Sequence, residues 1–390
     1  MRKKLKFPLL ARVLAAIVLG VALGNVADGT CVRLFLTFNS LFGQFLGFLI
    51  PLIIVGLVTP AIADIGRGAG RLLLLTVGIA FADTLLAGYL AYATGEQLFP
   101  AMVASAPHFN VAGTEPLKPF FEIQIPPMLD VMSALVLSFV LGLGIAYRDS
   151  YTLRGVFGEF REIVSGVIAK AIIPLLPVYI FGIFLNMTFT GEAWRIIAVF
   201  AQIIVVIVVL HVVILLYEYL VAGAVARRNP LRLLAGMMPA YFTALGTSSS
   251  AATIPVTLKQ TVRNGVSEGV AGFTVPLCAT IHLSGSMMKI TACALTICML
   301  GGQPHGLGLF THFILLLAVC MVAAPGVPGG AVMAALAPLA SVLGFDADMQ
   351  ALMIALYIAM DSFGTACNVT GDGAIAVIID KIQSRRKKVA

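Results

Sequence analysis

Long apolar runs dominate the chain and predict helices that cross a membrane. A spanning helix needs ~20 consecutive, mostly apolar residues. Six runs approach or exceed that length, at 8–27, 33–63, 72–95, 127–147, 163–189 and 196–225. The pattern therefore predicts six spanning helices in the first part of the chain.

Two later stretches are apolar and free of Asp, Glu, Lys and Arg, but each has a polar or kinked centre. One lies between Arg232 and Lys259, and the other between Lys289 and Asp346. Irregular backbone at membrane depth survives only where protein or a water-filled cavity satisfies its amides. Two such broken segments point to a transporter's binding site. Re-entrant hairpins and ordinary kinked helices both fit these residues.

Composition and charge place the chain in a bilayer. It is 60% hydrophobic and 11% charged, whereas a soluble domain carries about a quarter charged residues. The net charge of +7 comes from short basic clusters between the runs, which is typical of cytoplasmic loops. We therefore expect a multi-pass protein of the cell (inner) membrane with both termini cytoplasmic, and no nucleic-acid partner.

Four motifs in the second half carry a family resemblance. They are Ala244-Leu-Gly-Thr-Ser-Ser-Ser-Ala-Ala-Thr-Ile-Pro255, Pro276-Leu-Cys-Ala-Thr-Ile281, Gly326-Val-Pro-Gly329 and Asn368-Val-Thr-Gly-Asp372. In sequence and order they resemble the signatures of the dicarboxylate/amino acid:cation symporters, the glutamate-transporter family. The resemblance implies an all-α integral membrane protein with eight transmembrane helices and two re-entrant helical hairpins.

The same resemblance implies a homotrimer that works by an elevator mechanism. Its scaffold would comprise 1–69 and 127–189, and its mobile transport unit would comprise helix 3 at 70–95 and residues 190–390, with an extracellular loop at 96–126. The transport unit would hold helix 6, the first hairpin, helix 7, the second hairpin and helix 8.

For the solute, the resemblance implies that Asp361 binds an α-ammonium group. Asp361 and Asp372 lie about three helical turns apart, roughly on one helix face, and carboxylates at membrane depth are functional by default. Amides at the first hairpin tip would bind the solute carboxylate, and the second tip would close the outer gate. The other residues implied to form this site are Ser249, Ser250, Ala251, Ser286, Val327, Gly329, Gly364, Thr365 and Asn368.

A sodium site is implied beside the solute site. Its ligands would be the side chains of Asn368 and Asp372 and backbone carbonyls near Cys278 and Thr280. Sodium is the expected coupling ion, and protons are the alternative.

One departure from the family bears on specificity. Members that carry acidic substrates have an arginine three residues after the ammonium-binding aspartate, and here that position is Gly364. The other place for such an arginine is Ser248. Without a guanidinium, a second carboxylate would have no bidentate partner. This predicts a neutral amino acid as the solute; an acidic amino acid or dicarboxylate is the alternative.

The seventh helix departs as well. The family's Asn-Met-Asp-Gly-Thr is here His282-Leu-Ser284-Gly-Ser286, so an aspartate of a deeper sodium site is replaced by Ser284. Asp83 and Lys289 are charges that the pattern lacks. We expect Asp83 to lie close to Lys289 or His282, with a fixed or titratable cation replacing one sodium. The alternative is that Lys289 reaches an interface and His282 only donates hydrogen bonds.

Other charged residues of the apolar runs receive no role. Glu218 and His211 are expected to pack or to lie at an interface, with a role as proton carriers as the alternative. The sequence thus predicts a symporter of a neutral amino acid, with proton-coupled or uncoupled transport and an anion channel as alternatives. An intramembrane enzyme would need a pair such as Ser250 and His282, and we expect none.

Overall fold

The computed structural model describes residues 9–66, 71–104, 117–148, 150–191, 193–322, 324, 326 and 328–386. Every regular element in these ranges is helical. The first seven α-helices are α1 (Leu9–Gly24), α2 (Gly29–Gly66), α3 (Arg71–Val103), α4 (Val131–Arg148), α5 (Tyr151–Val167), α6 (Ile173–Phe189) and α7 (Ala193–Ala226), with a π-helical turn, Ile168–Ile172, between α5 and α6. The others are α8 (Pro230–Thr247), α9 (Ser250–Arg263), α10 (Glu268–Ile281), α11 (Ser284–Leu300), α12 (Leu307–Met321), α13 (Gly330–Ser341), α14 (Ala347–Ala359) and α15 (Asp361–Arg386).

The predicted apolar runs all fall on helices. Among the described residues, six segments are long and apolar enough to cross a membrane: Gly29–Ala63, Leu72–Val103, Tyr151–Phe189, Ile196–Ala226, Glu268–Leu300 and Asp361–Ser384. Large apolar side chains such as Val18, Val140 and Val205 are exposed on the helix surfaces, as expected where lipid is the solvent. The chain is therefore an integral membrane protein.

The third helix is longer than the apolar run that predicts it. α3 continues through Glu96 to Val103, whereas the sequence boundary places a loop from 96 onward. Phe99 is fully buried, so packing carries the helix past Glu96. Part of that predicted loop, 105–116, lies outside the described residues.

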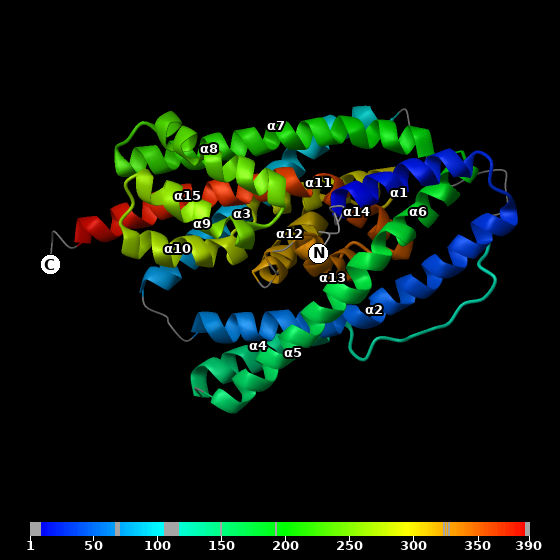
Figure 1. Cartoon of the computed structure of the whole chain (residues 1–390), viewed down its shortest axis with the longest axis horizontal. Helices are drawn as coiled ribbons and strands as arrows, with labels where there is room; N and C mark the ends of the chain where they lie inside the picture. The colour runs from blue at the N-terminus through cyan, green and yellow to red at the C-terminus, as the bar shows by residue number, and fades with distance from the viewer. Residues whose placement is uncertain are drawn as a thin grey trace, which may run out of the picture.

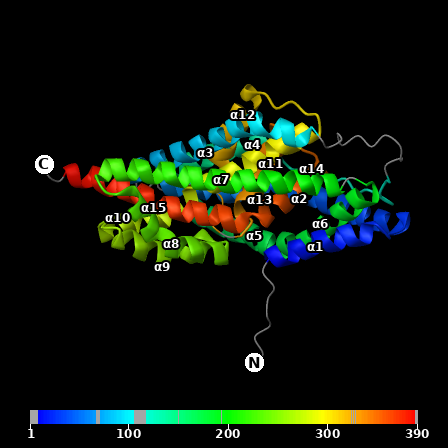
Figure 2. The same cartoon turned by 90° about the horizontal axis from the view of Figure 1, so that it is seen from above.

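The helices pack in two groups. Helices α1, α2, α4, α5 and α6 contact one another, while α3 and α7 to α11 gather around α15. In Figure 1, α4 and α5 lie along one side of the molecule and α7 and α8 along the other, and α15 runs between them. The view from above shows α7 and α15 running side by side, and they are in contact (Figure 2). Helices α13 and α14 also contact helices of the first group, and the division into scaffold and transport unit stays a prediction.

Several helices in the second half are interrupted. α8 and α9 pack together as a pair joined at Ser248, whose backbone is left-handed (φ 50°). α12 and α13 form a second packed pair. α10 gives way to α11 at His282 and Leu283, and α14 gives way to α15 at Met360. Each interruption frees backbone N–H and C=O groups inside the protein, where they can bind polar partners.

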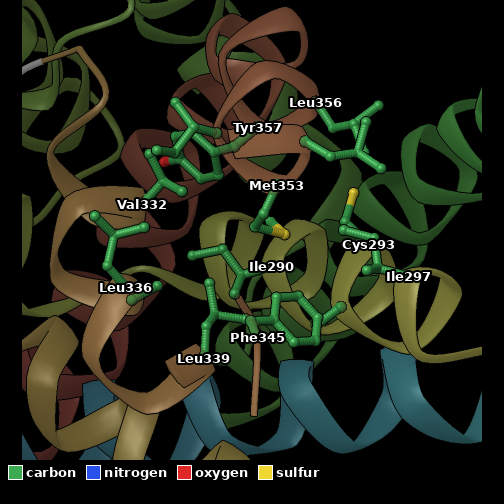
Figure 3. Packing of buried hydrophobic residues seen from close by; sticks show 14 of the residues in the cluster. Ile290, Cys293, Ile297, Val332, Leu336, Leu339, Phe345, Met353, Leu356 and Tyr357 are labelled. Atoms are coloured by element: carbon green, nitrogen blue, oxygen red, sulfur yellow. The ribbon is translucent and has the colours of Figure 1, made fainter. Parts of the chain in front are cut away.

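The apolar core lies between α11, α13 and α14. Figure 3 shows Ile290 of α11 beside Leu336 of α13 and Met353 of α14, with Cys293 on the other side of Met353. All four residues are fully buried. This packing holds the face of α11 that carries Ile290 and Cys293. Lys289, the charged residue described next, lies on the same helix.

Candidate functional site

The α14–α15 interruption places Asp361 at a helix N-terminus, where the helix dipole favours a carboxylate. Its Oδ2 accepts the backbone N–H of Gly329 at 2.8 Å. Its Oδ1 lies 3.5 Å from Nζ of Lys289 on α11. Both oxygens of this buried carboxylate therefore have partners, and one of the partners is a cation.

The side chain of Lys289 is wholly buried. Besides Asp361, its Nζ lies 3.3 Å from the carbonyl of Met360 and 3.8 Å from the centre of the Tyr357 ring. The ring distance is that of a cation–π contact. The alternative prediction, that Lys289 reaches a membrane interface, is wrong. The carboxylate, the carbonyl and the ring hold its ammonium group in the core.

Gly364, one turn after Asp361, makes room for this lysine. A Cβ at Gly364 would contact Cε of Lys289 and would lie 2.5 Å from Nζ. Gly364 presents no guanidinium, as the sequence shows. The ammonium group of Lys289, from another helix, fills the space that a side chain at this position would take.

The α8–α9 tip lies against the α12–α13 pair. Ser249 caps α9 by accepting the N–H of Ala252 at 3.2 Å, and its hydroxyl donates to the carbonyl of Gly326 at 2.9 Å. The N–H of Ala251 points to the same carbonyl at 3.3 Å. Ser250 is the buried first residue of α9. The structure thus brings the predicted residues of the α8–α9 tip together, and the Ala251 N–H and the Ser249 hydroxyl face the α12–α13 pair.

A hydroxyl contact ties this tip to α15, because Ser248 Oγ lies 2.8 Å from Ser362 Oγ. Gly329 completes the tip of the second pair, with a positive φ of 76° that favours glycine. Val327, the other predicted gate residue, lies outside the described residues.

The side chain of Asn368 forms hydrogen bonds with the first turn of α11. Its Oδ1 accepts the N–H groups of Gly285 at 2.8 Å and Ser286 at 3.3 Å, and its Nδ2 donates to Ser286 Oγ at 3.1 Å. Ser286 Oγ also lies 3.0 Å from the hydroxyl of Tyr357. Thr365 is buried on the same helix as Asn368. This network connects the predicted site residues of α11 and α15 directly to the Lys289 environment.

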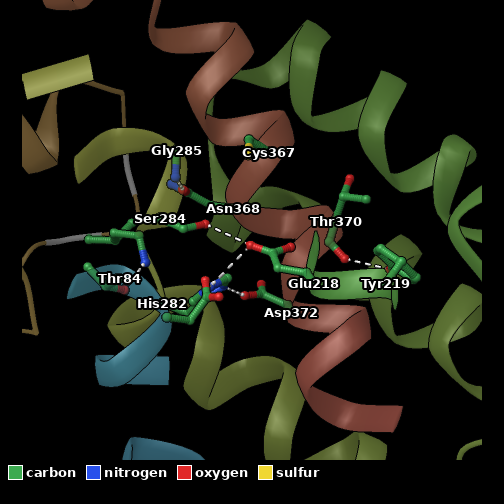
Figure 4. Close-up of polar contacts among 12 residues, drawn as sticks. Thr84, Glu218, Tyr219, His282, Ser284, Gly285, Cys367, Asn368, Thr370 and Asp372 are labelled. Atoms are coloured by element: carbon green, nitrogen blue, oxygen red, sulfur yellow. Dashed lines mark hydrogen bonds and ion pairs between the residues drawn. The ribbon is translucent and has the colours of Figure 1, made fainter. Parts of the chain in front are cut away.

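A second polar centre surrounds His282 at the α10–α11 interruption (Figure 4). Nδ1 lies 3.0 Å from Asp372 Oδ1, and Nε2 lies 2.9 Å from Asp83 Oδ2. Glu218 Oε1 is 3.9 Å from Nε2. One fully buried imidazole therefore faces three carboxylates from α3, α7 and α15. Of the two neighbours that the sequence allowed for Asp83, the structure selects His282.

Glu218 is the member that sequence reasoning missed, because it was assigned to packing. Its Oε1 accepts the hydroxyl of Ser284 at 3.1 Å, and its Oε2 is buried without a hydrogen-bond partner among the described residues. A Cβ at Gly371 would contact that oxygen. The available signal was a carboxylate inside the long apolar run of α7, where ionisable groups mark functional sites.

The centre borders a cavity of about 200 Å³. The lining residues are Ile79, Ala82, Asp83, Leu86, Tyr217, Glu218, Val221, Ala374, Ile375 and Ile378. Because Asp83 and Glu218 are both in the wall, a small cation entering the cavity would meet two carboxylates.

The residues predicted to hold sodium have hydrogen-bond partners within the protein. Asn368 Oδ1 accepts two N–H groups, the carbonyl of Cys278 accepts the N–H of His282 at 2.8 Å, and Asp372 Oδ1 faces the imidazole. The hydroxyl of Thr280 donates within its own helix to Leu277. The sodium site at Asn368, Asp372 and the carbonyls near Cys278 and Thr280 stays a prediction.

Spanning helices, paired tips and interruptions that enclose buried charges define a class of protein. These features belong to an integral membrane transporter whose binding centre lies among broken helices.

Comparison with known proteins places the chain within that class. The profile of the Sodium:dicarboxylate symporter family matches residues 9–382, so the chain belongs to this family and is a transporter, not an enzyme. It is 29% identical to the serine/threonine transporter SstT of Acinetobacter baumannii (strain AYE), over 98% of each chain. It is 28% identical to excitatory amino acid transporter 1 of Rattus norvegicus, over 68% of this chain and 50% of the relative.

Proposed function

We propose that the chain is a secondary active symporter that imports a small solute with one carboxylate group together with a cation. The observation that carries this proposal is the meeting of both helix-pair tips at the start of α15, through Ser249–Gly326 and Gly329–Asp361. A site closed by two tips can open to one side at a time, which secondary transport requires. Amides at the N-terminus of α9 are suited to a carboxylate.

The first candidate solute is a neutral amino acid. It has support from the serine/threonine relatives, which match over nearly the whole chain, and from Gly364, which presents no guanidinium. The second candidate is a small carboxylate solute that carries no ammonium group. It follows from the Lys289–Asp361 pair, because the lysine occupies the carboxylate expected to bind the ammonium of an amino acid.

The coupling ion has two candidates as well. Sodium is favoured by the family to which the chain belongs. A proton is favoured by one observation, the imidazole of His282 standing among Asp83, Glu218 and Asp372. Three carboxylates and one imidazolium leave two negative charges in excess, and a buried centre of that kind takes up protons or another cation.

The larger framework of the proposal comes from the resemblance. It comprises eight spanning helices with two re-entrant hairpins, α8–α9 and α12–α13, in a homotrimer with both termini in the cytoplasm. The transport unit, helix 3 and residues 190–390, would move as an elevator against the scaffold formed by 1–69 and 127–189.

Uptake into proteoliposomes tests the proposal. Purified protein is reconstituted and offered labelled carboxylate solutes under a sodium gradient, a pH gradient or neither. Concentrative uptake under one ion gradient supports symport and names the ion. Equilibration without concentration would reduce the function to uncoupled transport, and absence of uptake for every solute would refute the proposal.

A further inference from the structure

Lys289 lies at the carboxylate, Asp361, to which the resemblance assigns the ammonium of an amino acid. Its Nζ faces Oδ1 of Asp361 at 3.5 Å, and Gly329 occupies Oδ2. No other carboxylate among the described residues lies within ion-pairing distance of Lys289. An incoming ammonium group could reach Asp361 only by displacing the lysine or the α13 tip.

Displacement would leave the lysine in an unfavourable position. Its side chain is wholly buried, and the groups left to it are the Met360 carbonyl and the Tyr357 ring. Removing one partner of a buried ion pair leaves an uncompensated charge, which is strongly unfavourable. A neutral amino acid would create that situation, because its single carboxylate is directed to the amides of α9.

We propose that Lys289 is a tethered ammonium group that replaces the ammonium of the solute at Asp361. The solute of this transporter is then a small carboxylate without an amino group, of the 2-hydroxy or 2-oxo acid class. This inference rests on the proposed function, since it assumes that the site carries a carboxylate solute, and it names the class.

The remaining parts of the site fit such a solute. Its carboxylate would meet the N-terminal amides of α9, where the Ala251 N–H makes only a long, 3.3 Å contact with Gly326. The Lys289–Asp361 pair would stay closed throughout. In this scheme Gly364 leaves room for the side chain of Lys289, because any larger side chain there would collide with it.

The test compares two labelled solutes of nearly the same shape, L-lactate and L-alanine, which differ at one position, hydroxyl against ammonium. Labelled L-aspartate is offered as a third solute. Uptake and thermal stabilisation are measured for the wild-type protein, Lys289→Met and the matched control Lys259→Met, which changes an exposed lysine of α9. We expect the wild type and the control to favour lactate. In Lys289→Met, Asp361 becomes free for the ammonium of alanine, and the lactate-to-alanine preference should fall by about a hundredfold and invert.

Each other outcome has a definite meaning. A wild-type preference for alanine that Lys289→Met leaves unchanged overturns the inference and leaves the proposed function intact. A wild-type preference for L-aspartate, lost in Lys289→Met, also overturns it, because the lysine would then pair with a second solute carboxylate. Absence of uptake for every solute refutes the proposed function itself. If Lys289→Met does not fold, the wild-type stabilisation by lactate against alanine still decides the question.

Discussion

Two basic side chains are buried on the α10–α11 segment, and their surroundings differ in charge. Lys289 faces one carboxylate, Asp361, together with a carbonyl and an aromatic ring. His282 faces three carboxylates, from Asp83, Glu218 and Asp372. The first centre is balanced one to one, whereas the second has more negative than positive groups.

The comparison assigns different tasks to the two centres. A balanced buried pair has no electrostatic reason to take up or release an ion, so it can set which solute fits. A centre with excess carboxylates lowers its energy by binding a proton or another cation, so it can couple transport to an ion gradient. Specificity and coupling would then lie at opposite ends of the same stretch of helix.

The largest effect should come from breaking the balanced pair. Asp361→Asn leaves Lys289 buried without a counter-charge, and we expect a loss of about 3–5 kcal/mol in the free energy of unfolding together with loss of uptake. The double variant Asp361→Asn/Lys289→Met removes both charges and should recover most of that stability. Thermal unfolding of the detergent-solubilised protein measures both changes.

Asp380 supplies the control for this experiment, because it is an aspartate farther along α15 that accepts bonds from Ser267 at the surface. Asp380→Asn should change stability far less than Asp361→Asn. A double variant as unstable as Asp361→Asn alone would show that the pair is not a balanced unit.

A smaller effect is expected at the second centre. His282→Asn replaces the imidazole with an amide oxygen and restores the residue that the family motif carries at this position. The carboxylates should then accept sodium, so that sodium-stimulated uptake rises by about tenfold, or about 1.4 kcal/mol, and uptake driven by a pH gradient is lost.

The control for the ion switch is His305→Asn, since His305 is partly exposed and its imidazole faces one carboxylate, Glu96 at 4.0 Å, and the carbonyl of Gln303 at 3.0 Å. Uptake is followed in proteoliposomes under each gradient. Identical ion dependence in His282→Asn and the wild type would remove His282 from the coupling site.

Much of this could be predicted from the sequence, because apolar runs and tip motifs are local patterns. The helices follow from the apolar runs, and the resemblance carried by the tip motifs assigns both tips to one predicted site. The Lys289–Asp361 pair could not be predicted, because it depends on how α11 is rotated against α15. Glu218 was missed for a related reason: its partners Asp83 and His282 are distant in sequence, and only the tertiary packing of α3, α7 and α10 brings them together.

A third experiment tests why Gly364 leaves space. Gly364→Ala places a methyl group against Cε and Nζ of Lys289, and we expect it to destabilise the protein by about 1–3 kcal/mol through overpacking. Gly272→Ala is the matched control, because a Cβ there meets no other atom within 4 Å, so it should be neutral or stabilising. Lys289→Ala removes the atoms that the methyl group meets, so adding Gly364→Ala to Lys289→Ala should cost little further stability, and equal losses with and without the lysine would contradict the proposed contact.

The smallest change in the free energy of unfolding is expected for Glu218→Gln. It should stabilise the protein, whereas Asp361→Asn should destabilise it. Glu218→Gln removes one carboxylate charge from the His282 centre, and the amide oxygen can still accept the Ser284 hydroxyl that now binds Oε1. Because Oε2 is buried without a partner among the described residues, its replacement by an amide removes an unpaired charged oxygen. We therefore expect Glu218→Gln to raise the free energy of unfolding by about 1 kcal/mol while weakening ion-driven uptake. Asp361→Asn destabilises a balanced pair, so a destabilisation of similar size in Glu218→Gln would mean that the His282 centre is balanced too and that the difference between the two centres does not hold.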